Sequence, residues 1–202
     1  MTPTTPPATL SPPAQQRRER ILGASARCIA RSGVRGLRIQ QVAREAGVSS
    51  GLLYYHFGDR TGLLTASLEF VSERAARYAS GEGTDGDALA ELRSSLLDEL
   101  QDPPEVIENS SAWGELRASA IFEQGLRAPL ATATREWVDA IAEGIGQAQE
   151  ADLVPREIDA RAAATTLTAL VEGLSNRWLS GSLELAEARR LLDAAIGRVL
   201  EI

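Results

Sequence analysis

The chain has 202 residues, of which 44% are hydrophobic, and it carries a formal net charge of −7. This length and hydrophobic content predict a folded globular protein of one or two domains and exclude a chain that is disordered throughout. No apolar run approaches the roughly 20 residues needed to span a bilayer, so no membrane partner is expected.

The charge is unevenly distributed along the chain. Residues 14–62 hold nine arginines and three acidic residues, whereas the remainder holds twelve arginines and 25 acidic residues. A basic segment joined to an acidic body can approach phosphates with one end only. Chance segregation of solvated charges is the alternative, and the sequence motifs must decide between the two.

The first 13 residues contain five of the nine prolines and lack both the basic start and the apolar core of a signal peptide. The sequence therefore predicts a disordered tail over residues 1–13. Cys28 is the single cysteine, which leaves no internal disulfide and no cysteine-based metal site. A lone thiol is typical of the reducing cytoplasm, where we expect this protein to work without a metal or other cofactor.

Helical spacing begins directly after the tail. Four residues share the apolar face of a first helix that ends near residue 33: Ile21, Leu22, Cys28 and Ile29. A short helix is expected over residues 39–45, after which Gly47 suits a left-handed turn and Ser49 an N-cap. The second short helix that begins there ends near residue 58, and Asp59 can cap a long helix that runs to about Tyr78.

The glycine-rich segment 81–86 marks a break before the second half of the chain. Further helices are predicted over residues 87–100, 110–124, 129–150, 156–179 and 183–200. Alternation with a period of two is missing, and Ala, Leu, Arg and Glu dominate the composition. The sequence therefore predicts an all-α fold.

Residues 39–57 meet the requirements of a helix-turn-helix, in which a tight turn crosses two short helices locked by apolar side chains. The packing positions are Val42, Ala43, Val48 and Leu53. Small residues at the start of the second helix would let the backbone approach DNA: Ser49, Ser50 and Gly51. Three further side chains offer groups for phosphates or base edges: Tyr54, Tyr55 and His56.

Core packing is the main alternative for some of these side chains. We expect Phe57 to pack against the first helix, and the same role is open for Tyr54. A single imidazole without neighbouring carboxylates or thiols makes no metal site, so phosphate contact is favoured for His56. Cys28 is expected to be a small buried hydrophobe rather than a redox switch.

The stretch from Ile39 to Leu64 resembles the DNA-binding signature of the TetR family. The similarity rests on Val42-Ala43, Ala46-Gly47-Val48-Ser49, Leu53-Tyr54-Tyr55-His56-Phe57 and the segment from Arg60 to Leu63. It is specific over residues 16–68, and the rest of the chain is similar only in helix number and length. The resemblance implies a three-helix DNA-binding head over residues 14–62, joined by a long helix to a ligand-binding and dimerisation body over residues 63–202.

The resemblance also implies roles for single residues. Gln40 and Arg60 would lie at backbone phosphates, and the recognition helix would comprise Ser49, Ser50, Gly51, Tyr54, Tyr55 and His56. Arg38 stands where the family commonly places a threonine that caps the helix. Because an arginine cannot accept the free N–H bonds, the cap is in doubt, whereas a contact with DNA phosphate is still expected.

The acidic body contains all three tryptophans. Candidates for a ligand pocket are Trp113, Arg117, Phe122, Trp137 and Trp178, with core filling as the alternative for the aromatic residues and solvated surface for the arginine. The last two predicted helices each carry an apolar stripe. By resemblance these stripes form the interface of a homodimer, with packing inside one chain as the alternative: Leu167, Leu170, Val171, Leu174, Leu191, Leu192, Ala195, Ile196 and Val199.

These observations predict a sequence-specific transcriptional regulator, a repressor that a small organic inducer releases from double-stranded operator DNA. An architectural DNA-binding protein without a ligand is one alternative, but it gives no reason for a large acidic body with three tryptophans. An all-helical enzyme is the other. It has little support, because the sequence holds no histidine outside the motif, no cysteine pair, no nucleotide-binding glycine loop and no nucleophile elbow.

Overall fold

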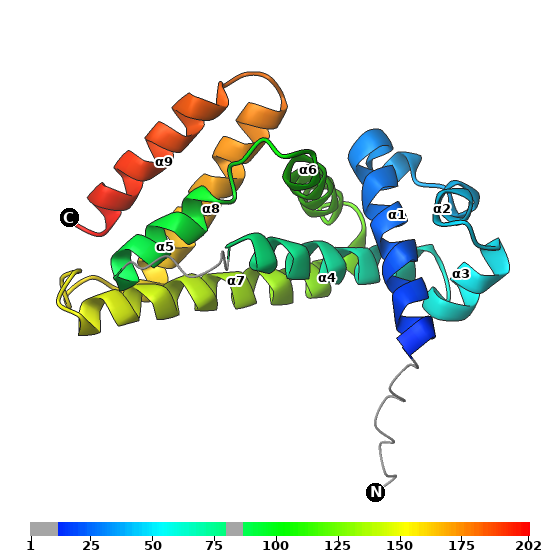
Figure 1. Cartoon of the computed structure of the whole chain (residues 1–202), viewed down its shortest axis with the longest axis horizontal. Helices are drawn as coiled ribbons and strands as arrows, with labels where there is room; N and C mark the ends of the chain where they lie inside the picture. The colour runs from blue at the N-terminus through cyan, green and yellow to red at the C-terminus, as the bar shows by residue number, and fades with distance from the viewer. Residues whose placement is uncertain (1–11, 80–86) are drawn as a thin grey trace, which may run out of the picture.

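The computed structural model describes residues 12–79 and 87–202, and the regular structure of these residues is entirely α-helical (Figure 1). Their helices are α1 (Pro12–Gly36), α2 (Ile39–Ala46), α3 (Ser50–Phe57), α4 (Arg60–Ala79), α5 (Ala88–Leu97), α6 (Pro104–Ser119), α7 (Gln124–Glu150), α8 (Ala160–Leu179) and α9 (Leu185–Val199). The all-α prediction is confirmed. Residues 1–11 of the predicted disordered tail lie outside the described residues, and so does the break predicted at 81–86. The last two residues of that predicted tail instead begin α1, where a proline in the first turn loses no helical hydrogen bond.

Polar side chains begin several of these helices, as the sequence predicts. The Ser49 hydroxyl accepts the Leu52 N–H at 3.3 Å at the start of α3, and the Asp59 carboxylate accepts the Gly62 N–H at 2.8 Å at the start of α4. Each of these bonds satisfies a backbone donor that the first helical turn leaves free. The two short connections of the motif are therefore set by residues within it.

Two helix starts differ from the prediction. Helix α6 begins at Pro104 rather than near residue 110, because proline in the first turn loses no helical hydrogen bond. Helix α7 begins at Gln124 and continues through Pro129. Here tertiary contacts outweigh the local disruption by proline, since Leu126 is buried and Arg127 donates to the carbonyls of Ala120 and Ile121.

Two hydrophobic cores organise the molecule. The first fills the space among α1–α4 and also takes Ala112 and Leu116 from α6 and Leu126 from α7. The boundary expected at residue 62 therefore falls inside this core, because Leu63 and Leu68 of α4 belong to it. The second core lies among α5, α7, α8 and α9.

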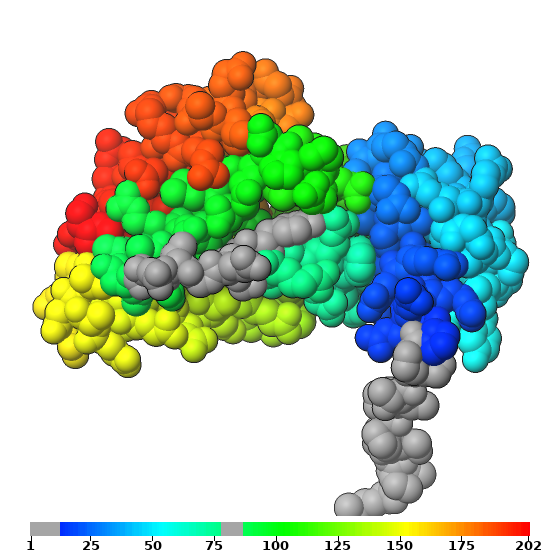
Figure 2. All heavy atoms as spheres, in the orientation of Figure 1, coloured from blue at the N-terminus to red at the C-terminus, as the bar shows by residue number. Residues whose placement is uncertain are grey.

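Helices α1–α3, called the head below, lie at one end of the molecule (Figure 1). Helices α4 and α7 contact each other and run from the head along the body, which comprises α4–α9. Figure 2 shows the head, in blue and cyan, standing at the opposite end from the C-terminal helix in red. Because α1 packs closely on α6, head and body share a broad internal contact.

Candidate nucleic-acid interface, body cavity and dimer surface

Helices α2 and α3 are joined by a tight turn centred on Gly47. This glycine has φ 66° and ψ 39°, the left-handed conformation that other residues adopt at a cost. The turn is closed by the Val48 N–H, which donates to the Ala43 carbonyl at 2.9 Å. Val42 and Leu53 are both buried, so the crossing of the two helices is fixed from both sides.

The outer face of α3 is open to solvent. Tyr55 is 81% exposed and Tyr54 is 49% exposed, which is unusual for aromatic side chains of this size. Gly51 is also exposed, and a Cβ built there would meet only the Ser49 hydroxyl, at 3.9 Å. These residues form a surface that a polar partner can approach closely.

The other aromatic residues of α3 are less open. Phe57 is partly buried against the first core, as predicted, and the Arg18 guanidinium of α1 lies 5.7 Å from its ring centroid. The Nε2 atom of His56 is buried, and its imidazole pKa is lowered by burial and by the charges of Arg17 and Arg18. An uncharged imidazole can reach a phosphate only as a neutral N–H donor.

The arginines at the start of α1 were not assigned to the interface from the sequence. Their charges act on His56, so Arg17 and Arg18 add positive potential beside the exposed face of α3. The signal was present in the sequence as three arginines within residues 17–20. It was not decisive there, because a cluster of surface arginines on an amphipathic helix carries no information about which neighbouring helix it will adjoin.

Arg38 and Gln40 are both exposed at the start of α2. Arg38 makes no side-chain cap bond, as its chemistry predicts. Arg60 points elsewhere: its guanidinium donates to the Val34 carbonyl at 2.7 Å and pairs with Glu123 at 3.1 Å. Since both bonds lie at the junction of head and body, we leave Arg60 out of the interface proposed below.

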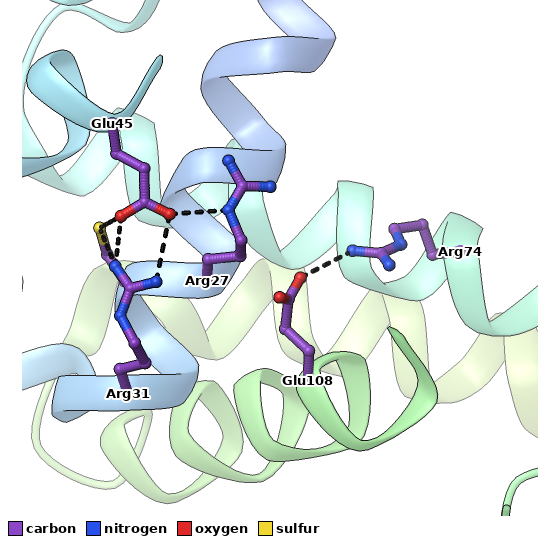
Figure 3. Close-up of polar contacts among 6 residues, drawn as sticks. Arg27, Arg31, Glu45, Arg74 and Glu108 are labelled. Atoms are coloured by element: carbon purple, nitrogen blue, oxygen red, sulfur yellow. Dashed lines mark hydrogen bonds and ion pairs between the residues drawn. The ribbon is translucent and has the colours of Figure 1, made fainter. Parts of the chain in front are cut away.

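A carboxylate on α2 fastens that helix to α1 (Figure 3). Glu45 accepts from the Arg27 Nε at 2.7 Å, pairs with Arg31 and accepts from the Cys28 thiol at 3.3 Å. The hydrogen bond from Arg31, followed by that from Arg27, lowers the pKa of Glu45 to about 2. Burial, followed by the adjacent carboxylate, raises the pKa of Cys28 to about 11, so the thiol stays protonated and unreactive. Figure 3 also shows Arg74 of α4 paired with Glu108 of α6.

Acidification is expected to weaken this junction. Because the folded-state pKa of Glu45 is depressed, its contribution to stability is complete above its ordinary pKa of 4.5 and is lost as the pH falls toward 2. Glu45→Gln should therefore lower the free energy of unfolding by about 1 kcal/mol at neutral pH and by less at about pH 3.5. Urea titrations followed by circular dichroism measure both values. The exposed Glu143→Gln serves as control, and an equal loss at both pH values would contradict this account.

A cavity of about 430 Å³ lies within the body, lined by residues of α4 to α8 and of the turn after α5. Trp113 and Trp137, two of the predicted pocket residues, line it. The Trp113 indole N–H donates to Glu172 at 3.1 Å, and Glu172 also pairs with Arg117 at 2.6 Å. Arg117 thus lies behind the cavity wall, where it also donates to Thr134 at 2.8 Å.

Two predicted pocket residues lie elsewhere. Phe122 is 72% exposed, and its ring packs under the Arg35 guanidinium at 5.3 Å from the centroid. Trp178 packs against the second core and does not line the cavity. Neither residue is therefore part of the ligand site proposed below. The sequence showed that these rings are apolar, but not which helix faces would enclose an empty space.

Residues 21–66 match the model of a family described as bacterial regulatory proteins, tetR family. Residues 88–201, more than half of the chain, match the model for the C-terminal part of BetI-type transcriptional repressors. The chain belongs to the TetR family. It is a transcriptional regulator with an N-terminal helix-turn-helix DNA-binding domain, and members of this family bind operator DNA and dimerise.

Individual relatives cover most of the chain. The transcriptional regulator BetI of Burkholderia thailandensis is 30% identical over 169 residues, which span 83% of this chain and 82% of that protein. The structure of a TetR-family regulator from Rhodococcus sp. has a TM-score of 0.88 with 53% identity, covering 92% of this chain and 99% of that one. A regulator from Saccharomonospora viridis, solved in complex with choline, has a TM-score of 0.77 with 29% identity, covering 90% and 96% of the two chains. Among the described residues, no helix of this TetR-family protein is long and apolar enough to cross a membrane.

Much of the surface predicted to form the dimer interface on α8 and α9 is buried within the single chain. Five of the nine assigned residues are buried within the single chain, in the second core: Leu167, Val171, Leu174, Leu192 and Ile196. Helical spacing marks the face that a helix buries, but not whether the partner belongs to the same chain. Here α8 and α9 bury that face against each other and against α5 and α7.

The opposite faces of α8 and α9 remain open. Leu170, Ala195 and Val199 are partly exposed, and Leu191 is 38% exposed. Small residues surround them on the exposed side of both helices: Ala162, Thr166, Ala169, Gly173 and Ala194. Small side chains around an exposed leucine suit close helix packing between two subunits of a TetR-family dimer.

Proposed function

We propose that this TetR-family regulator is a homodimeric repressor, released from operator DNA by a small organic ligand that binds in the body cavity. Its DNA contacts would come from the exposed sides of α2 and α3: Arg38, Gln40, Ser49, Ser50, Gly51, Tyr54, Tyr55 and His56. A two-fold dimer presents two such surfaces about 34–36 Å apart or at a multiple of this spacing, which requires a palindromic operator. The partner subunit would pack on the outer faces of α8 and α9.

The observation that carries this proposal is that α6 contacts both the cavity and the head. Trp113 of α6 lines the cavity, and two residues later the Glu115 carboxylate accepts the Val34 N–H of the head at 3.2 Å. Glu123, just beyond α6, pairs with Arg60, which in turn donates to the Val34 carbonyl. The N–H and the carbonyl of Val34 are therefore both held by residues of the body, Glu115 of α6 and Arg60 of α4.

The end of α1 in the head accommodates the contact with Glu115 of α6. Gly33 has φ 69° within α1, and a Cβ at this position would lie 2.8 Å from the Glu115 carboxylate oxygen. Glycine thus permits the backbone conformation and leaves room for the Glu115 carboxylate at its present position. A ligand that moves α6 would change how the head is held, and such coupling is typically about 1–3 kcal/mol.

The choline complex of the Saccharomonospora viridis relative supports a body that accepts small organic molecules. The chain described here has a cavity of about 430 Å³, which lies in the range of about 300–1,000 Å³ typical of such sites. The cavity also favours a sensor over a purely architectural DNA-binding protein, which would have no use for it.

Filling the cavity tests the proposal. Ala140 lines the cavity from α7, so Ala140→Trp should preserve operator binding and abolish ligand-induced release. The matched control is Ala151→Trp, an exposed position just after the same helix, which should respond like the wild type. Fluorescence anisotropy of a labelled operator, with and without fractionated extract of the source organism, measures both properties. Undiminished release from the Ala140→Trp variant would reject the cavity as the ligand site.

A further inference from the structure

The polar lining of the body cavity is acidic. Four carboxylates line it, from α4, the turn after α5, α7 and α8: Glu73, Glu99, Glu136 and Glu172. No arginine is among the lining residues. Glu73 and Glu136 are exposed, whereas Glu99 and Glu172 are partly buried. A cavity that presents carboxylates without cations repels anions and attracts positive charge.

These carboxylates are not equivalent. Glu172 is balanced by the ion pair with Arg117 and by the hydrogen bond from Trp113. For Glu99, by contrast, the described residues provide no ion pair. Burial, followed by the charges of Asp98 and Glu172, raises its pKa to about 7. Glu99 is thus an enclosed acid whose negative charge has no compensation within the part of the chain that the structure describes.

Asn109 of α6 supplies a second group without a partner. Its Nδ2 donates to the Val71 carbonyl at 3.0 Å, whereas its Oδ1 is buried and accepts no hydrogen bond from the described residues. Because Asn109 lines the same cavity, this acceptor is available to a ligand that carries an O–H or N–H group. A buried acceptor without a donor is unfavourable, and such a ligand would supply the missing hydrogen bond.

Two indole rings complete the site. The Arg117 guanidinium lies 5.5 Å from the centroid of the Trp113 ring, so this ring already has a cation on one side. Trp137 lines the cavity from α7 and is partly exposed. Tryptophan faces attract organic cations more strongly than other aromatic side chains do. The carboxylates and the Trp137 ring therefore favour a cationic ligand, and the free Asn109 acceptor suits one that also carries an O–H or N–H group.

We propose that the cavity binds an organic cation, a quaternary or protonated amine, and that the Glu99 carboxylate recognises its charge. This inference rests on the cavity being the ligand site of the proposed function. The groups of α4, α7 and α8 that line the cavity with Glu99 are Glu73, Glu136 and Glu172, all of them acidic. Asp98 precedes it, and the nearby Arg117 is paired with Glu172.

Binding should then be linked to loss of a proton. A bound cation favours the ionised form of Glu99, so the proton held by the protonated fraction passes to the buffer when the ligand binds. Affinity should rise with pH while Glu99 is largely protonated and level off once it is ionised. With a pKa of about 7, the rise between pH 6 and pH 8 should be about tenfold.

The test uses the full-length dimer with two cations, choline and benzyltrimethylammonium, and their neutral isosteres in which carbon replaces nitrogen. Isothermal titration calorimetry should show at least one cation binding about tenfold or more tightly than its isostere. Titrations in two buffers of different ionisation enthalpy should reveal the released proton. Glu99→Gln should remove both the preference for charge and the pH dependence. Glu99→Asp should keep the preference with weaker binding.

Glu91→Gln, at an exposed position of α5 outside the cavity, is the matched control and should bind like the wild type. Circular dichroism verifies that each variant is folded, and the neutral glutamine is easier to bury than the carboxylate. Equal affinity for cation and isostere, no binding of either cation at about millimolar concentration, or unchanged binding by Glu99→Gln would overturn the inference. Operator release by neutral ligands would then leave the proposed function standing. Cation binding that leaves operator affinity unchanged would instead reject the proposed function and uphold the cation site.

Discussion

Replacing Tyr55 by alanine is expected to lower operator affinity at least about 30-fold and to leave the free energy of unfolding within about 0.5 kcal/mol of the wild type. Tyr55 is 81% exposed on α3 and packs only edge-on against the His56 ring, with centroids 5.3 Å apart. Its exposure means that the fold does not depend on it. A well-formed contact with a base is worth about 1–3 kcal/mol, and a dimer loses it in both heads.

Leu53, two residues earlier, provides the matched contrast. It is 1% exposed and belongs to the first core, so Leu53→Ala should cost about 2–5 kcal/mol of stability. Anisotropy with operator and with unrelated DNA measures affinity and specificity, and urea unfolding measures stability. A Tyr55→Ala variant that binds operator as tightly as the wild type would remove Tyr55 from the interface.

The helix-turn-helix was predictable because its determinants are local. Each determinant acts on neighbours within a few residues: the left-handed turn at Gly47, the cap at Ser49 and the buried Leu53. The local sequence is therefore sufficient to predict the motif. The contact of Arg60 was not predictable in this way, because its partners Val34 and Glu123 come from the end of α1 and the segment after α6.

The body could be predicted only in outline. Trp137 and Trp178 both pack against the second core, yet of the two only Trp137 also lines the cavity. Which of them faces a space depends on how five helices meet, and no short segment encodes that. Glu99 was missed for a related reason: an acidic residue in a turn normally lies in solvent, and only its enclosure by other helices gives it a chemical role.

Two adjacent leucines of α9 differ in burial, because one lies at the surface of the subunit and the other in its core. Leu191 is 38% exposed on the outer face, whereas Leu192 is fully buried among α5, α8 and α9. A charge at Leu191 would be buried only when two subunits meet, and a charge at Leu192 would be buried in every folded subunit. A charge at Leu191 should therefore prevent dimerisation, whereas a charge at Leu192 should prevent folding of the subunit.

Leu191→Glu is expected to give a folded monomer whose affinity for a full operator is lower by about 10²–10⁴-fold, because one head alone loses the advantage of simultaneous engagement. Leu192→Glu is expected to lose helical structure or to unfold at much lower urea concentration, since an unpaired carboxylate would lie inside the second core. Sedimentation equilibrium gives the mass of each variant, and circular dichroism shows whether its helices persist. If Leu192→Glu were instead a folded monomer while Leu191→Glu stayed dimeric, the inner stripe would form the interface, and α9 would have to pack differently in the dimer.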